Sequence, residues 1–198
     1  MVCWIVFVGC FMSKILVTGF EAFSGVERNP SEDVARRLGG VGVDSFVLPV
    51  TRDAGRIVGE LVVGGYDIVL HFGINIHIDR LELERVAINL YDSSKPDNDG
   101  YVALEDAVVE GGPAAYFSTL GVKEVARVLK RECVPCAVSN SAGTYICNLV
   151  LYHSLHAASL RGLDSRIGFV HVPPLSRDIS EEVLVGWCGR LLEVVRGI

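Results

Sequence analysis

The stretch Asp67-Ile-Val-Leu-His-Phe-Gly73 decides the fold class. Its apolar residues form a continuous run instead of alternating with polar ones, which predicts a strand that is covered on both faces. A helical pattern over 53–63 precedes this strand, and runs over 14–18 and 45–50 predict two earlier strands with a helix up to residue 39 between them. Because strands alternate with helices, we predict an α/β fold built from βαβ units.

The same alternation continues towards the C-terminus. An amphipathic pattern predicts a helix over 122–131, and a short strand over 137–139 follows it. Residues 167–173 predict a further strand that two prolines stop, and 180–196 predict a closing amphipathic helix. One segment departs from helical rhythm, because polar and apolar residues alternate from 79 onwards, and we predict that it is extended.

Length and composition limit what the protein can be. The chain has 198 residues, half of them hydrophobic, which is enough for one sizeable core and short for two domains. A net charge of -6 leaves no basic field for nucleic acid. The six cysteines are irregularly spaced, so we expect no disulfide framework and a cytoplasmic location.

The first eleven residues form an apolar run that is too short to span a bilayer and lacks the positive leader of a signal peptide, so we expect no membrane partner. Met12-Ser-Lys-Ile-Leu has the pattern of a natural protein start, with Met12 as the first residue and the first predicted strand directly after it. We therefore expect 1–11 to be a non-native or disordered extension, and 12–198 to be a single domain.

A candidate nucleophile lies in Ser141-Ala-Gly-Thr-Tyr-Ile-Cys147-Asn148. Small residues here precede an apolar run without proline or glycine until Gly162, which predicts a tight loop that opens a buried helix with Cys147 in its first turns. A helix N-terminus and a nearby imidazolium both favour the reactive thiolate form of a cysteine. The alternative is that Cys147 is a small buried hydrophobe.

Two further residues could complete a catalytic group. His171 is predicted near the carboxyl end of a strand, where open α/β sheets place their active sites, although a histidine can also be purely structural there. Glu84 shares one face of the extended segment with Arg80 and Glu82, which is equally the pattern of a solvated edge strand with a local ion pair. Spacing alone does not show that these side chains meet.

Six motifs occur in an order that is specific to one family. They are Gly19-Phe-Glu-x-Phe23, Asn29-Pro-Ser31, Glu84-Arg-Val-Ala-Ile-Asn89, Pro96-Asp-Asn98, Ser141-Ala-Gly-Thr-Tyr-x-Cys-Asn148 and Gly168-Phe-Val-His-Val-Pro173. From about Lys14 to Pro173 the chain resembles pyroglutamyl peptidase type I, a family of cysteine exopeptidases. The resemblance implies a three-layer α/β/α sandwich with a mostly parallel mixed sheet, assembled as a homo-oligomer, a dimer or a tetramer.

The resemblance also implies the activity, which is removal of an N-terminal pyroglutamyl residue from peptides through a thioester, with no metal or cofactor. Matched by motif, Cys147 is the nucleophile, His171 the general base and acid, and Glu84 the residue that orients the imidazole. Phe20 and Phe23, which from their own stretch either cap the core or line a pocket, become the walls of an aromatic substrate slot together with Tyr145.

The chain departs from the family pattern beside this slot. His77-Ile78 stands where the family usually has glycine and arginine, and Ser93-Ser94-Lys95 stands where it has alanine, arginine and isoleucine. Because a guanidinium fork and an ammonium group bond differently, these changes bear on substrate choice more than on reaction class. Two alternatives therefore stay open: a related thiol hydrolase or amidase acting on another small cyclic or acylated amine, and a catalytically weak binding homologue.

Overall fold

The computed structural model describes residues 13–23 and 25–198. Our expectation about residues 1–11 lies outside the described residues. Within the described part of the chain, no helix has both the length and the apolar character that crossing a membrane requires.

A six-stranded sheet forms the centre of the molecule, in the order β2-β1-β3-β8-β4-β7. Neighbouring strands are parallel except at one junction, where β4 runs antiparallel to β8. The predicted mostly parallel mixed sheet is thus confirmed. The strands are β1 (Ile15–Phe20), β2 (Val43–Leu48), β3 (Ile68–Ile74), β4 (Leu81–Glu84), β7 (Cys136–Ser139) and β8 (Arg166–Val172), with β5 (Val86–Ile88) and β6 (Ala115–Phe117) forming a separate antiparallel pair.

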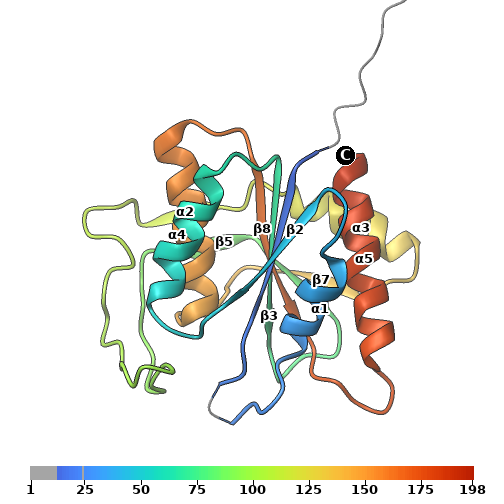
Figure 1. The fold of residues 1–198 in the computed structure, drawn as a ribbon, viewed down its shortest axis with the longest axis horizontal. Coiled ribbons are helices and arrows are strands. Elements are labelled where there is room, and N and C mark those ends of the chain that lie inside the picture. Colours follow the sequence, from blue (N-terminus) through green and yellow to red (C-terminus); the bar gives the residue numbers. More distant parts are fainter. Residues whose placement is uncertain (1–12, 24) are drawn as a thin grey trace, which may run out of the picture.

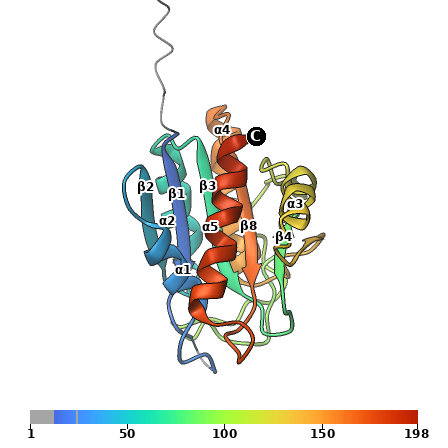
Figure 2. The same cartoon turned by 90° about the vertical axis from the view of Figure 1, so that its right-hand side faces the viewer.

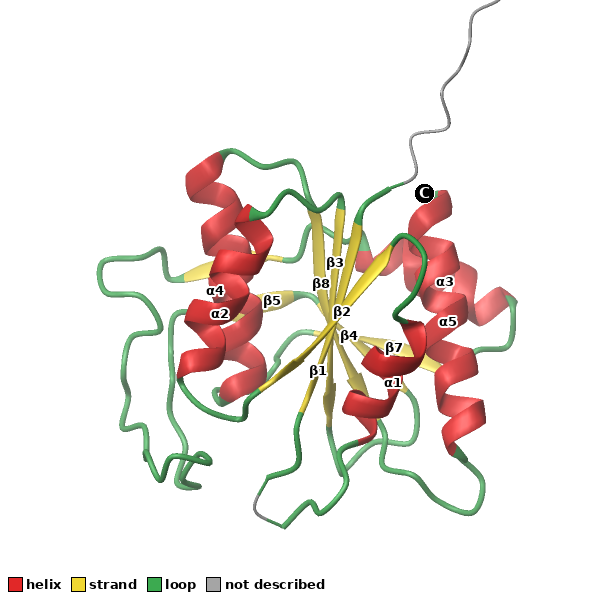
Figure 3. Cartoon of the chain, in the orientation of Figure 1, coloured by secondary structure: helices red, strands yellow, loops and turns green. Residues whose placement is uncertain are grey.

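Helices cover both faces of this sheet, so the predicted three-layer sandwich is also confirmed (Figures 1 and 3). One layer consists of α2 and α4, which pack against each other, and the other consists of α1, α3 and α5 (Figures 1 and 2). Their bounds are α1 (Pro30–Leu38), α2 (Asp53–Val63), α3 (Val122–Arg131), α4 (Ile146–Arg161) and α5 (Glu181–Gly197).

The hydrophobic core occupies both spaces between the layers. All six residues of β1 and the first six of β3 are buried, as expected for strands that meet helices on both sides. Each face of the sheet has its own apolar cluster, with Leu70 and Phe72 in one and Val69 and Phe169 in the other. The continuous apolar run at 67–73 is therefore explained by the position of β3 in the middle of the sheet.

The segment from 79 onwards is extended, as predicted, but its alternative interpretation as a solvated edge strand is wrong. The strand β4 lies between β8 and β7, in the interior of the sheet. The local ion pair does exist, since Arg80 contacts Glu82 with a nitrogen-to-oxygen distance of 3.2 Å. Glu84, two residues further on, is completely buried and lies among catalytic candidates instead of in solvent.

The carboxyl ends of β1, β3 and β8 reach the same edge of the sheet, at the bottom of Figure 1. The helix α4 begins near this edge and runs back along the sheet (Figure 3). The strand β1 extends two residues beyond the predicted strand, so that Phe20 ends the strand instead of lying in the following loop. Phe20, Gly73 and His171 lie at or next to these strand ends.

Candidate active site

Cys147 is the second residue of α4 and is partly buried. The loop before it folds locally as the small residues predict: Gly143 adopts a left-handed φ of 76°, which residues with a Cβ rarely adopt. The hydroxyl of Thr144 donates a hydrogen bond to the carbonyl of Asp92 over 2.6 Å, which fixes the loop to a neighbouring segment. The thiol is free and lies where the first N–H groups of the helix lack intrahelical acceptors.

His171 and Glu84 form a buried pair across the antiparallel junction of β8 and β4. The carboxylate oxygen Oε1 of Glu84 lies 2.7 Å from Nδ1 of His171. The backbone partner of His171 in the sheet is Glu82, so Glu84 reaches the ring diagonally, from one pleat further along the same face. Since Nδ1 faces the carboxylate, Nε2 is the ring nitrogen left for chemistry.

The side chains of Cys147 and His171 line the same cavity, and the Cys147 sulfur acts electrostatically on the His171 imidazole. Burial alone lowers the pKa of this imidazole, but the sulfur of Cys147 and the carboxylate of Glu84 outweigh burial and raise the pKa of His171 above its ordinary value. The imidazolium form is therefore favoured at neutral pH, and an imidazolium beside sulfur stabilises a thiolate. Sequence reasoning proposed these three residues, and the structure brings all of them together.

Gly73 makes room for this arrangement and was not singled out from the sequence. It lies opposite His171 in the pairing of β3 with β8. A Cβ at this position would lie 2.7 Å from Cζ of Phe169 and 3.0 Å from the sulfur of Cys147, well inside normal contact distances of about 3.5–4.0 Å. A glycine inside an otherwise buried strand often marks such a close approach, so the signal was present in the sequence.

A small cavity of about 70 Å³ lies on one side of the Cys147 sulfur. Its walls include the three predicted pocket residues, Phe20, Phe23 and Tyr145, and its other lining residues are mostly aliphatic. The lining residues are Phe20, Phe23, Asn29, Val50, Ile74, Tyr145, Ile146 and Cys147. Such a cavity favours a compact, mostly apolar group over a charged one.

A larger cavity of about 500 Å³ lies beside the small one and is bordered by His171. The two cavities share Phe23, Ile74, Tyr145 and Cys147, so the sulfur lies at the passage between them. The other walls of the larger cavity include the small residues Ser141, Ala142 and Gly143, and the polar residues Asn75, His77, Ser93 and Lys95. Of the five positions that depart from the family pattern, His77, Ser93 and Lys95 thus line the larger cavity, and none lines the smaller one.

The Phe20–Phe23 segment is held by polar residues of two other motifs. The hydroxyl of Ser31 accepts a hydrogen bond from the backbone N–H of Phe20 over 3.0 Å, and the Asn29 amide donates to the Glu21 carbonyl, also over 3.0 Å. The Asn98 amide donates to the Glu21 carboxylate over 2.9 Å. The separate motifs therefore form one network whose structural effect is to fix the aromatic wall.

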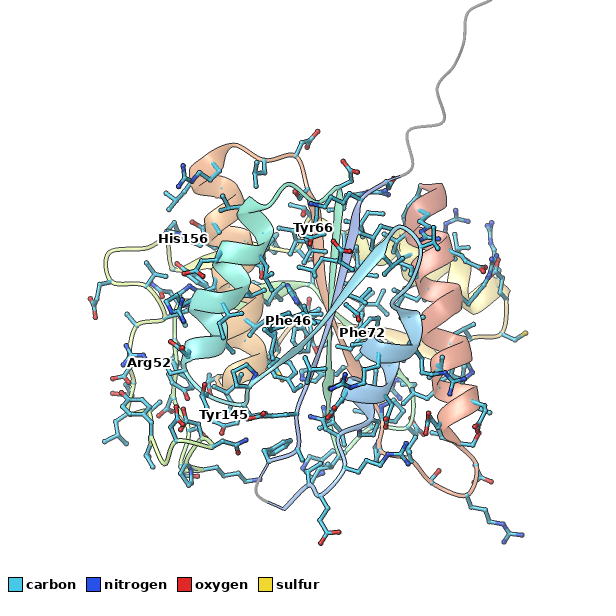
Figure 4. The ribbon with its side chains drawn as sticks, in the orientation of Figure 1. Phe46, Arg52, Tyr66, Phe72, Tyr145 and His156 are labelled. Atoms are coloured by element: carbon cyan, nitrogen blue, oxygen red, sulfur yellow. The ribbon has the colours of Figure 1, made fainter. Side chains whose placement is uncertain are left out.

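Tyr145 is anchored from the other side. It lies at the lower end of α4 in Figure 4, and its hydroxyl donates a hydrogen bond to the carbonyl of Pro96 over 3.1 Å. The next residue but two, Asn148, accepts from the backbone N–H of Ile88 and donates to the carbonyls of Ile88 and Leu90, each over 2.9 Å. Asn148 thus ties α4 to the end of β5 and to the segment directly after it, a role that the sequence motif alone did not reveal.

Comparison with known proteins relates this chain to a family of peptidases. The sequence model of the family described as pyroglutamyl peptidase matches residues 13–193. The chain is 42% identical to a pyrrolidone-carboxylate peptidase from Thermococcus onnurineus over 81% of its own length and 83% of the relative's, and 43% identical to one from Thermococcus kodakarensis over 81% of each. It superimposes on the solved pyrrolidone carboxyl peptidase from Thermococcus litoralis with a TM-score of 0.86 at 30% identity, covering 92% of this chain and 93% of that one.

Proposed function

This chain belongs to the pyroglutamyl peptidase family and is an enzyme of that type, and we propose that it hydrolyses N-terminal pyroglutamyl residues from peptides through Cys147, His171 and Glu84. The observation that carries the proposal is the position of the Cys147 sulfur between a small apolar cavity and the His171 imidazole. The small cavity receives the lactam ring, which is compact, mostly apolar and lacks a free amine. The larger cavity receives the rest of the peptide.

The first step is attack of the Cys147 thiolate on the carbonyl carbon of the pyroglutamyl bond. A carbon–sulfur bond forms, and the carbonyl π electrons move onto oxygen. Backbone N–H groups at the start of α4 are the proposed donors to this oxyanion, and losing one such donor typically costs roughly 10²–10³-fold in rate. The raised pKa of His171 supports this step, because it favours the thiolate and imidazolium pair before substrate arrives.

Collapse of the intermediate then breaks the carbon–nitrogen bond. The departing amine takes the proton from Nε2 of His171, which leaves a neutral imidazole and a pyroglutamyl thioester on Cys147. Glu84 holds the ring through Nδ1, so that Nε2 faces the reacting atoms in both protonation states.

Water completes the cycle. The neutral His171 removes a proton from a water molecule, whose oxygen attacks the thioester carbonyl, and the carbon–sulfur bond breaks to regenerate the thiolate and free pyroglutamate. Loss of the amine empties the larger cavity, which His171 borders, and this supplies a path for water to the thioester.

The proposal includes the setting in which the enzyme works. The thiols of Cys133, Cys136, Cys147 and Cys188 are all free, which suits a reducing compartment such as the cytoplasm. Assembly as a dimer or tetramer is proposed from the family resemblance alone. Light scattering on the purified protein measures the assembly directly.

The test of function uses pyroglutamyl-2-naphthylamide beside alanyl-2-naphthylamide. We expect release of naphthylamine from the first compound only, no release by Cys147→Ser, and full release by the matched control Cys133→Ser, because Cys133 is exposed and lines neither cavity. Mass spectrometry after an acid quench should find the pyroglutamyl group on Cys147. No release from either compound, with Cys147 still alkylated rapidly by iodoacetamide, would instead favour a thiol hydrolase or amidase acting on a different acylated amine.

A further inference from the structure

Among the described residues that line the larger cavity, Lys95 is the one with a permanently charged side chain. No aspartate or glutamate occurs among these described lining residues, while Lys95 supplies an ammonium group and His77 and His171 supply imidazoles. Glu84, the nearest carboxylate in the mechanism, is completely buried and bonded to His171, so its charge is directed away from the cavity. A peptide that enters on this side therefore meets the positive charge of Lys95.

Lys95 has no carboxylate partner of its own. No ion pair within 4.0 Å involves its ammonium group among residues 13–23 and 25–198, whereas seven of the fourteen arginines have such partners. Arg80, for example, contacts both Asp79 and Glu82. The ammonium of Lys95 is thus free to pair with a group that the protein itself does not supply.

The backbone of Lys95 is fixed relative to the nucleophile. Its N–H donates to the hydroxyl of Ser93 over 3.1 Å, which closes a short turn, and Pro96 restricts the chain directly after it. The carbonyl of Pro96 accepts the hydrogen bond from Tyr145, a residue that lines both cavities. A lysine side chain is flexible, but here its base is anchored on the leaving-group side of Cys147.

From this arrangement we infer that Lys95 selects peptides that carry a carboxylate on the residue directly after pyroglutamate. The inference rests on the proposed function and adds the class of leaving group that the site prefers. The carboxylate comes either from an acidic side chain at that residue or, in a dipeptide, from its terminal carboxyl group. Both place one negative charge in the larger cavity, one residue beyond the bond that is cleaved.

The expected preference is modest, because Lys95 is exposed. An exposed ion pair contributes little to binding free energy, and a contribution of that size corresponds to about a two- to fivefold change in kcat/KM. The amine leaves before the thioester is hydrolysed, so the preference should affect binding and acylation but not the hydrolysis of the thioester. Salt should weaken the preference, since the screening length falls to about 3 Å at 1 M ionic strength.

The test compares isosteric substrates that differ only in charge. To test a side-chain carboxylate, we compare cleavage of pyroglutamyl-glutamyl-amide with cleavage of pyroglutamyl-glutaminyl-amide. To test a terminal carboxylate, we compare pyroglutamyl-alanine with its amide. In 20 mM buffer we expect at least one charged member to be cleaved with about two- to fivefold higher kcat/KM than its neutral partner. In 0.5 M sodium chloride this ratio should fall towards one.

Variants assign the preference to Lys95. Lys95→Met should bring the ratio of kcat/KM for charged and neutral substrates to one, and Lys95→Arg should keep the preference for the charged substrate. The control Lys123→Met should leave this ratio unchanged, because Lys123 lies on α3 and lines neither cavity. Equal cleavage of charged and neutral partners by the unmodified enzyme, or a ratio that survives Lys95→Met, would overturn the inference while leaving the function intact. If none of the four compounds and no pyroglutamyl naphthylamide were cleaved, the proposed function would fail, and the inference with it.

Discussion

Oε1 of Glu84 lies 2.7 Å from Nδ1 of His171, whereas Oε2 of the same carboxylate is buried without a hydrogen-bond partner among the described residues. A buried carboxylate oxygen without a partner is costly, so this side chain is not placed there for stability alone. The arrangement is consistent with a carboxylate whose purpose is to hold one tautomer of one imidazole.

Replacing Glu84 by glutamine should therefore lower turnover strongly without unfolding the protein. The glutamine amide can donate to Nδ1, which would leave the proton on Nε2 and make that atom unable to act as a base. A comparable change in a serine protease triad costs about 10⁴-fold, and we expect a loss of kcat of about a hundredfold or more here. Steady-state kinetics with pyroglutamyl-naphthylamide and a circular dichroism spectrum measure the two effects.

Glu82→Gln is the matched control for this change. Glu82 lies on the same strand and is the direct sheet partner of His171, but its carboxylate contacts Arg80. Its replacement should change kcat by less than about threefold, as expected for a weak surface pair. Sensitivity of Glu82 together with tolerance at Glu84 would show that we have chosen the wrong carboxylate.

Gly73→Ala should displace the nucleophile. The new methyl group would lie 3.0 Å from the Cys147 sulfur and 2.7 Å from the Phe169 ring, so one of these groups must move. Because a displacement of about 1 Å can cost roughly 10²-fold in rate, we expect kcat/KM to fall by about that factor. Gly186→Ala is the control, since nothing lies within 4 Å of the added methyl group in α5, and its activity should be unchanged. Full activity of Gly73→Ala would refute the packing argument.

Iodoacetamide should label Cys147 faster than the other described cysteines near pH 7. Burial raises the pKa of both Cys136 and Cys188, which protects them, and leaves the exposed Cys133 as the internal comparison. Because the pKa of His171 is raised, its imidazolium persists above the pH at which an ordinary histidine loses its proton. Labelling of Cys147 should therefore remain faster than labelling of Cys133 throughout the range from pH 6 to 8.

The variant His171→Ala isolates the contribution of the imidazolium. Labelling of Cys147 should slow down towards the rate of Cys133, as measured by peptide mass spectrometry at several times. An unchanged rate at Cys147 would mean that the sulfur and the imidazole are not coupled.

Protein stability should decrease in mild acid because of His71, which belongs to the core and not to the site. Burial lowers the pKa of His71 to about 3, while Thr18 and Ser154 bond its two ring nitrogens over 2.7 and 2.9 Å. Between pH 6.5 and 3 the unfolded chain binds a proton at this residue and the folded chain does not, so the free energy of unfolding falls as pH falls. The loss attributable to His71 is at most about 5 kcal/mol.

Urea unfolding at pH 7, 6, 5 and 4 measures this dependence. The variant His71→Gln, which keeps a donor and an acceptor, should lose less stability between pH 7 and 4 than the unmodified protein. An NMR titration of the unmodified protein provides a second measurement, in which the His71 ring should remain neutral down to pH 5. Protonation of His71 near pH 6.5 in the folded state would contradict the prediction.

The fold was largely predictable because hydrophobic periodicity carries most of its information. The helices over 53–63 and 122–131 have the predicted bounds, and β3 has the predicted burial. The inner position of β4 was not predictable, since alternation shows which residues share a face but not which strands are neighbours. The strand β6 was missed because three residues, two of them exposed, carry too little pattern.

The candidate site was predictable to a different extent for each residue. Cys147 and His171 were found because a helix start and a strand end are visible in the sequence. Glu84 could not be separated from a surface carboxylate by pattern, and its burial depends on β8 and β7 lying on either side of it. A glycine inside a buried strand signals a close approach at Gly73, but no local pattern identifies the approaching group, a sulfur 74 positions away.

The proposed reacting groups and the proposed substrate contacts come from different kinds of structure. His171 and Glu84 project from strands inside the sheet, and Gly73 from a third strand beside them, so their relative positions change only if the sheet itself changes. Phe23 and Lys95 belong to the connections at the rim. Replacing those connections should therefore change which acyl groups or leaving groups the enzyme accepts, while the residues on the sheet stay as they are.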